Sequence, residues 1–136
     1  MNDIDSSFLY PDRYNPVMLK KVRCSTLLDA TRYMPCTLRI ASFVPGMKCS
    51  GRDTVVPCHC GNVGKGMSTR VSDMMIAAGC HICHDILDGR REGDRDYIMK
   101  NYPAAVMHRI MSGVFETQAM LIEMGLIVIP GAEIIG

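Results

Sequence analysis

The most informative segment of this chain is CHICHDILDGR, which spans residues 80–90. It places Cys80 and Cys83 three positions apart, a spacing that lets two thiolates bind one metal ion. A histidine directly follows each of these cysteines, which strengthens the case for metal chemistry. We expect a short helix over 83–90 that ends at Gly89. The segment therefore predicts half of a zinc site beside a short helix.

The other half of the site must come from elsewhere, and the sequence offers two pairs. Cys36 and Cys49 flank a turn between two β-prone runs, so a hairpin would bring both sulfurs to one point. Cys58 and Cys60 are the competing pair, and alternation along a strand would point His59 away from both. Spacing alone leaves the choice between the two pairs open.

The cysteine content also bears on the compartment. Seven cysteines among 136 residues is an odd number, which disfavours a complete disulfide framework and favours metal binding in a reducing environment. The N-terminal dozen residues are acidic and polar, unlike a signal peptide. No run approaches the roughly 20 apolar residues of a membrane helix. We expect a soluble, cytoplasmic protein with no membrane partner.

The remaining patterns predict an α+β fold in which helices flank the metal-binding core. The C-terminal helix should begin at Pro103, end at Gly125, and carry an apolar stripe from Val106 to Ile122 that includes Met107, Met111, Val114, Phe115 and Leu121. The predicted segments are a flexible leader over 1–14, a helix over 15–31, strands over 37–40 and 54–56, a glycine-rich loop over 61–66, a helix or turn over 72–78, and a C-terminal helix and tail within 95–136. We expect residues 15–136 to form one domain.

Charge is distributed unevenly along the chain, although the net charge is only +1. Residues 13–70 carry ten basic residues against two acidic ones, a balance of +8. Such a segment is typical of a surface that contacts a phosphate backbone. Lys65 and Arg70, in and after the glycine-rich loop, are candidates for phosphate contacts. The segment is therefore a candidate for a polyanion-binding face, with an ordinary solvated surface as the alternative.

Taken in order, these motifs resemble the zinc-bearing HNH nucleases of the ββα-metal class, and more narrowly the YbcO-like nuclease family of lambdoid phages and prophages. The resemblance rests on PCTLRI at 35–40, Cys49, His59, GKGM at 64–67, Ser72-Asp73 and the segment 80–90. It implies a zinc-stapled ββα core over 32–94 and a phage-encoded endonuclease that acts on DNA in the host cytoplasm. Recombination proteins of the phage or host are further partners that it implies.

The resemblance also implies roles for single residues. Cys36, Cys49, Cys80 and Cys83 would bind a structural zinc ion. His59 would be the general base, and His84 would hold a catalytic divalent ion, Mg²⁺, Mn²⁺ or Zn²⁺. The chemistry agrees, because histidine titrates near neutral pH and a cation offsets charge on the reacting phosphoryl group. Since a base must be neutral to act, His59 is expected to stand clear of a buried ion pair.

One position departs from the family pattern. Many HNH nucleases have an acid directly before the general-base histidine as a second ligand of the ion, and here that position is Cys58. A thiolate is a poor ligand for Mg²⁺. Asp85, Asp73 and Cys58 itself are the candidates for an accessory ligand. The alternative function is a non-catalytic zinc module that binds DNA or a recombination partner, and a third is a structural zinc protein whose Met-rich C-terminal helix mediates oligomerisation.

Overall fold

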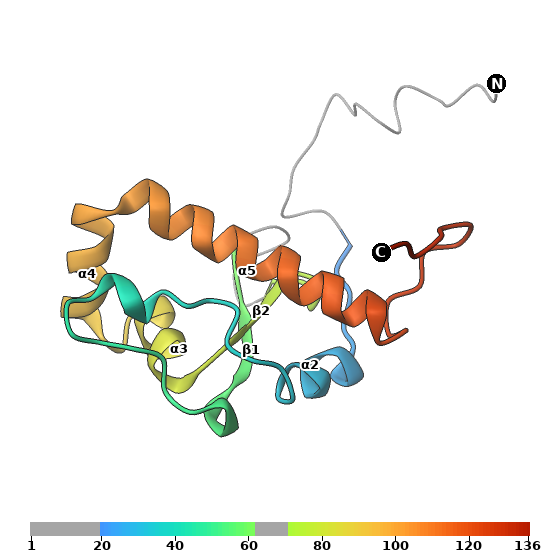
Figure 1. Ribbon diagram of the computed structural model, residues 1–136, viewed down its shortest axis with the longest axis horizontal. Helices are drawn as coiled ribbons and strands as arrows, with labels where there is room; N and C mark the ends of the chain where they lie inside the picture. The colour runs from blue at the N-terminus through green and yellow to red at the C-terminus, as the bar shows by residue number, and fades with distance from the viewer. Residues whose placement is uncertain (1–19, 62–70) are drawn as a thin grey trace.

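The computed structural model describes residues 20–61 and 71–136, which form a mixed α+β fold (Figure 1). Its elements are, in order, α2 (Ser25–Thr31), the short 3-10 helices η2 (Ala41–Phe43) and η3 (Arg52–Thr54), β1 (Val56–His59), β2 (Ile76–Gly79), α3 (His81–Asp88), α4 (Glu92–Asn101) and α5 (Pro103–Glu123). The predicted leader, the start of the predicted helix over 15–31, Lys65 and Arg70 lie outside the described residues. None of the helices in the two described ranges is long and apolar enough to cross a membrane.

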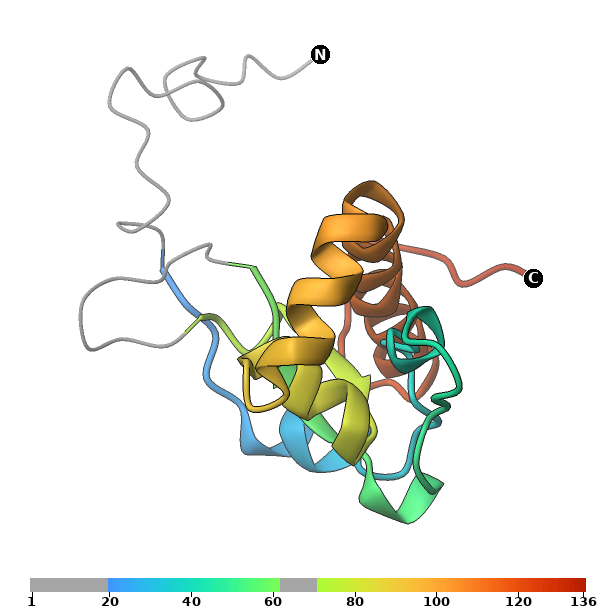
Figure 2. The same cartoon turned by 90° about the vertical axis from the view of Figure 1, so that its left-hand side faces the viewer.

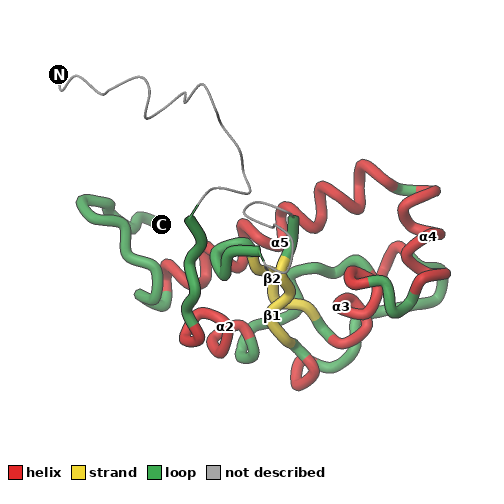
Figure 3. Tube along the Cα trace, turned by 180° about the vertical axis from the view of Figure 1, so that it is seen from behind, coloured by secondary structure: helices red, strands yellow, loops and turns green. Residues whose placement is uncertain are grey.

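The two strands form an antiparallel sheet at the centre of the molecule, with α2 toward one end and α3 and α4 toward the other (Figure 3). Val56 pairs with Gly79, and His59 pairs with Ile76. A single residue, Cys80, separates β2 from α3. The chain therefore runs strand, strand, helix through the segment that carries His59 and the CHICHDILDGR motif.

The predicted hairpin between 37–40 and 54–56 is wrong, because β1 pairs with β2 instead. Residues 37–40 lie against β2 without joining the ladder, since the amides of Thr37 and Leu38 both donate to the carbonyl of Ala78, at 2.7 and 3.2 Å. Arg39 then adopts a φ of 49°, which turns the chain before further pairing. Residues 76–79 form β2, and all four are buried, whereas the sequence predicted a helix or turn over 72–78.

The predicted N-terminal helix is shorter than expected, because α2 begins only at Ser25. Residues 20–24 are not helical. The amide of Val22 donates to Ser72 Oγ at 3.0 Å, and its carbonyl accepts from the amide of Asp73 at 2.9 Å. These hydrogen bonds join residues that are far apart in the sequence, and they replace the local hydrogen bonds that a helix would make.

Helix α5 begins at Pro103, as predicted, and it crosses the sheet and adds Val106, Val114 and Leu121 to the core. Gly125 has a φ of +75° just beyond its end, which confirms the predicted C-terminal cap. The buried face is narrower than the predicted stripe, since Met107, Met111 and Phe115 are exposed. Its buried residues are Val106, Gly113, Val114, Thr117 and Leu121.

Two of these buried residues, Gly113 and Thr117, explain why this narrow face of α5 packs against the core. Thr117 Oγ1 donates to the carbonyl of Gly113 at 2.8 Å, lies 3.0 Å from Thr37 Oγ1, and accepts from the amide of Ala78 at 3.2 Å. Gly113 lies against the backbone of residue 37 with no room for a larger side chain. A small residue and a hydroxyl thus let α5 approach β2 and the 37–40 segment closely.

We expect Gly113→Ala to lower the free energy of unfolding by about 1–3 kcal/mol, because the added Cβ would lie 2.8 Å from the carbonyl oxygen of Thr37. The matched control is Gly93→Ala in α4, where an added Cβ meets no atom within 4 Å. That change should stabilise the protein by about 0.4–1 kcal/mol. Urea unfolding of both variants measures the difference, and equal stabilities would contradict this account of the packing.

Candidate functional site

Four cysteine side chains converge beside the start of α3. The sulfur atoms of Cys36, Cys49, Cys80 and Cys83 all lie within 4.8 Å of one another, and the sulfurs of Cys49 and Cys83 are 3.7 Å apart. In a tetrahedral zinc site with Zn–S bonds of about 2.3 Å, neighbouring sulfurs lie about 3.8 Å apart. The arrangement therefore fits a structural zinc ion.

Hydrogen bonds from the segment around Cys49 hold it against α3. Ser50 Oγ accepts from the amide of Ile82 at 3.3 Å, and Thr54 Oγ1 accepts from the amide of His81 at 3.1 Å. The first amides of a helix have no partner within the helix, so these two hydroxyls act as its N-terminal caps. Capping α3 in this way brings Cys49 to the two cysteines of the motif without a hairpin.

Cys36 is held by a tight turn. The amide of Arg39 donates to its sulfur at 3.4 Å, and Arg39 itself adopts the left-handed backbone conformation, which typically costs a non-glycine residue about 1–2 kcal/mol. The Arg39 guanidinium also pairs with Glu116 of α5 at 2.8 Å. Strain maintained in this way is typical of functional sites.

The thiols of the cluster differ strongly in acidity. The pKa of Cys36 is lowered to about 5, chiefly because Cys83 donates a hydrogen bond to its sulfur, and the same interaction raises the pKa of Cys83. Burial raises the pKa of Cys49 to about 12. The hydrogen bond from Cys83 thus favours the thiolate form of Cys36 while Cys49 and Cys83 favour the thiol form, and binding a cation would release protons from these two.

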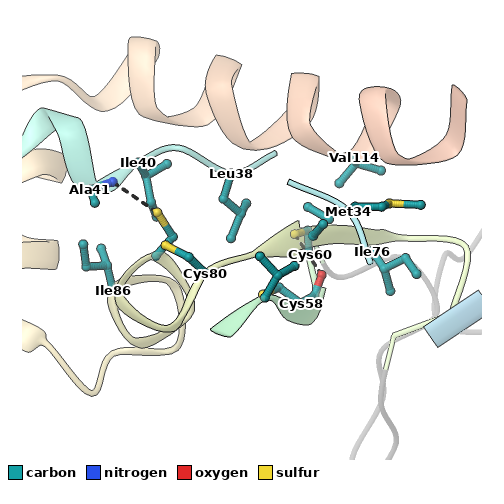
Figure 4. Close-up of a cluster of buried hydrophobic side chains, with 14 of the residues drawn as sticks. Met34, Leu38, Ile40, Ala41, Cys58, Cys60, Ile76, Cys80, Ile86 and Val114 are labelled. Atoms are coloured by element: carbon teal, nitrogen blue, oxygen red, sulfur yellow. Dashed lines mark hydrogen bonds between the residues drawn. The ribbon is translucent and has the colours of Figure 1, made fainter. Parts of the chain in front are cut away.

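The other three cysteines lie outside this cluster. Cys58 and Cys60 are buried on the strand side of the core, away from Cys80 in Figure 4. Burial raises the pKa of both thiols, that of Cys60 to about 11. Cys58 therefore packs as a neutral core residue and is not grouped with His84 as an accessory ligand.

A second group of potential ligands lies on α3 and comprises His84, Asp85 and Asp88, whose ligand atoms lie within 4.8 Å of one another. Arg90 balances the two carboxylates, with Nε 3.2 Å from Asp88 Oδ2 and Nη1 3.6 Å from Asp85 Oδ1. Asp85 Oδ1 is buried and accepts no hydrogen bond within the described residues. An imidazole and two carboxylates, one with a buried oxygen still lacking a donor, suit a divalent cation.

His59, at the end of β1, contacts a buried carboxylate. Its Nε2 lies 2.8 Å from Asp73 Oδ1, and the Asp73 side chain is 1% exposed. The expectation that His59 would stand clear of a buried ion pair is therefore wrong. Asp73 Oδ2 also accepts from the amide of Cys24 at 2.8 Å, which fixes the carboxylate in place. A carboxylate on one ring nitrogen orients an imidazole and leaves the other nitrogen to accept a proton.

This contact also changes the role open to Asp73. Its carboxylate is engaged with His59 and the backbone, and it does not join His84 in a metal-binding group. Asp85 does join that group, and so does Asp88, to which sequence reasoning gave no role. The spacing of His84 and Asp88, four residues apart on a helix, was the signal available for it.

His59, His84 and Asp88 line one pocket of about 500 Å³. Its walls come from the end of β1, from α3 and α4, and from the first part of α5; α3, α4 and the start of α5 face the viewer in Figure 2. Arg95 of α4 also lines it and was not predicted from the sequence. The pocket thus joins the histidine–aspartate pair of β1 and the candidate cation site of α3 in one cleft.

A family model described as "Putative nuclease YbcO" matches residues 25–126, three quarters of the chain. The match runs from the first residue of α2 to just beyond α5, so it contains both ligand groups and the pocket. No curated protein and no solved structure matches.

Proposed function

The chain belongs to the YbcO nuclease family, and on this premise we propose that it is a metal-dependent endonuclease that hydrolyses phosphodiester bonds in DNA. The observation that carries the proposal is that His59 and His84 line one pocket, with Asp88 beside His84. A protein that only binds DNA has no need of a carboxylate-oriented histidine next to a cation site. The proposed core is HNH-like, with β1, β2 and α3 as its ββα unit.

In the proposed reaction His59 is the general base. With Nε2–H donated to Asp73, its Nδ1 carries the lone pair that removes a proton from the attacking water. Asp73 is then a positioning residue, and it stabilises the imidazolium that forms. The 2.8 Å contact between the two side chains supports this assignment.

His84 and Asp88, with Asp85 at the edge of the group, would hold the divalent ion. When bound, the ion supplies positive charge that offsets the charge on the reacting phosphoryl group and leaving oxygen. Arg90 must release the carboxylates for the ion to bind, since its guanidinium now lies against both. Many HNH nucleases have an acid directly before the general-base histidine as a ligand of the ion, and this chain has Cys58 at that position. In this proposal Asp88 serves as that ligand instead.

The proposed DNA partner is supported by basic residues near His59. Lys20, Lys21 and Arg23 belong to the segment that runs beside residues 71–73, and Arg23 Nη1 lies 3.9 Å from the Asp73 carboxylate that holds His59. Lysines and arginines grouped beside a phosphodiesterase site would hold the DNA backbone.

We expect the purified protein to nick supercoiled plasmid in the presence of Mg²⁺, Mn²⁺ or Zn²⁺. His84→Ala should raise the concentration of divalent ion needed for half-maximal nicking by at least about tenfold, because a ligand of the ion is lost, and excess ion should restore part of the rate. The matched control is His108→Ala, which removes an exposed histidine of α5 that lies outside both ligand groups.

An unchanged requirement for the ion in His84→Ala would contradict the assignment of this ligand. If the wild-type protein binds DNA but nicks no substrate with any of the three ions, the nuclease proposal is wrong. The alternative, a zinc-stabilised DNA-binding module, would then take its place.

A further inference from the structure

The pocket that holds His59 and His84 has two chemically different parts. The ends of β1 and α3 supply the polar part, with His59, His84 and Asp88. Helices α4 and α5 supply Met99, Met107 and Ile110, and a floor of buried aliphatic side chains lies beneath them. Reaction with a phosphate at the histidines does not require this apolar part.

The apolar part is accessible to a ligand. Met99 is 36% exposed and Met107 is 54% exposed, although both line the pocket. Two flexible thioether side chains left in contact with water suit a flat apolar surface that can enter and cover them. At about 500 Å³, the pocket has the size of a site for a ligand as large as one nucleotide, far too small for a duplex.

An uninterrupted duplex presents phosphates and sugars on its outside and keeps its bases paired and stacked. It therefore offers nothing apolar to Met99 and Met107 when a phosphate lies at His84. An unpaired nucleotide offers a base face that can turn out of the stack and pack against apolar side chains. The base and the phosphate are covalently linked, which matches a single pocket with one apolar and one polar part.

Arg95 supplies a cation at the same pocket. Its guanidinium makes no ion pair or hydrogen bond with any residue in 20–61 or 71–136, unlike those of Arg90 and Arg91 beside it. It lies near the end of α3, since a Cβ at Gly89 would be 3.3 Å from Arg95 Nη1. The Arg95 guanidinium is therefore in place to bind a phosphate next to a base that has turned out of the stack.

We propose that this pocket receives an unpaired nucleotide, so that the substrate is DNA with a single-stranded segment at the cleavage site. The inference rests on the proposed function, because it places the scissile phosphate at the histidines. Met99, Met107 and Ile110 contact the base, and Arg95 binds the neighbouring phosphate.

The test compares three fluorescently labelled DNAs of one sequence: a single strand, a blunt duplex, and the duplex with a short unpaired bubble. Binding is measured by fluorescence anisotropy with His59→Ala protein, so that cleavage does not interfere. We expect the bubble and the single strand to bind at least about tenfold more tightly than the duplex. Cleavage of the same DNAs is measured with wild-type protein.

Substitutions on α5 provide a matched pair. Met107→Gln should weaken binding to the bubble about five- to tenfold and leave duplex binding unchanged, because the apolar contact with the base is lost. Met111→Gln changes a methionine one turn away that is 51% exposed and does not line the pocket, so it should change neither affinity by as much as about twofold.

Equal affinity for the bubble and the duplex, or equal effects of the two substitutions, would overturn the inference. Preferential cleavage of the uninterrupted duplex would also overturn it and leave the nuclease proposal intact. Preference for the bubble in binding, with sensitivity to Met107→Gln but no cleavage of any DNA, would support the pocket assignment and refute the nuclease proposal.

Discussion

Cys83→Ser is expected to abolish zinc binding and to lower the melting temperature by at least about 15 °C. Cys83 is fully buried, its sulfur lies 3.7 Å from that of Cys49, and it accepts a hydrogen bond from the amide of Ala41. A serine hydroxyl is not a ligand that zinc accepts in such a site. Zinc contributes about 10–16 kcal/mol to the folding of small zinc domains, comparable with the whole net stability of a domain.

The matched control is Cys60→Ser. Cys60 is also buried, but it lies outside the cluster, and its thiol donates to the carbonyl of Cys58 at 3.3 Å, a bond that a serine hydroxyl can also make. Zinc content and melting temperature should stay near those of the wild type. Metal analysis and calorimetry distinguish the two variants. A Cys83→Ser protein that melts normally without zinc would rule out the proposed structural zinc site.

His59→Ala is expected to lower the rate of DNA cleavage by about 10²–10⁴-fold, the usual contribution of a general base. The side chain ends β1, lines the pocket and, among the described residues, makes its side-chain hydrogen bond with Asp73. Zinc content, melting temperature and affinity for DNA should therefore change little. Single-turnover nicking assays at saturating divalent ion measure the rate of the chemical step.

Asp73→Asn provides a second measurement of the same mechanism. An amide can accept a hydrogen bond from His59 but cannot balance its charge, so the rate should fall while the fold is largely kept. The pH profile should then shift, since the stabilised imidazolium is lost. His59→Ala protein that retains full activity across the pH range would show that another group removes the proton from water.

The sequence predicted the elements whose signals are local. The capping glycines at 89 and 125 mark the ends of α3 and α5, where each has a positive φ. Alternation along β1 placed Cys58 and Cys60 on one side and His59 on the other, and their burial agrees with this. These features depend on a few neighbouring residues, so a single sequence carries them.

Other elements depend on contacts that the sequence does not display. Strand β2 reads Ile-Ala-Ala-Gly, which favours a helix by propensity, but α5 and β1 enclose it and its amides and carbonyls pair at long range. Helix α4 has a single buried residue, Ile98, and so shows no apolar period. The role of Asp73 was missed because its partner lies 14 residues away on another element.

The proposed zinc ligands are divided between the two halves of the domain, and this sets an order for its biosynthesis. Cys49 and Cys83, whose sulfurs are in contact, lie 34 positions apart in the sequence. Both strands of the sheet lie between them. While the ribosome is still making β2, Cys36 and Cys49 lack the other two ligands of the site, and β1 lacks its partner strand. Within residues 20–61, Cys36 and Cys49 depend on the two cysteines beside α3 to complete the ligand set, and β1 depends on β2 to form a sheet. Folding should therefore begin only once Cys83 has emerged, in a single late step that takes up metal and forms the sheet together.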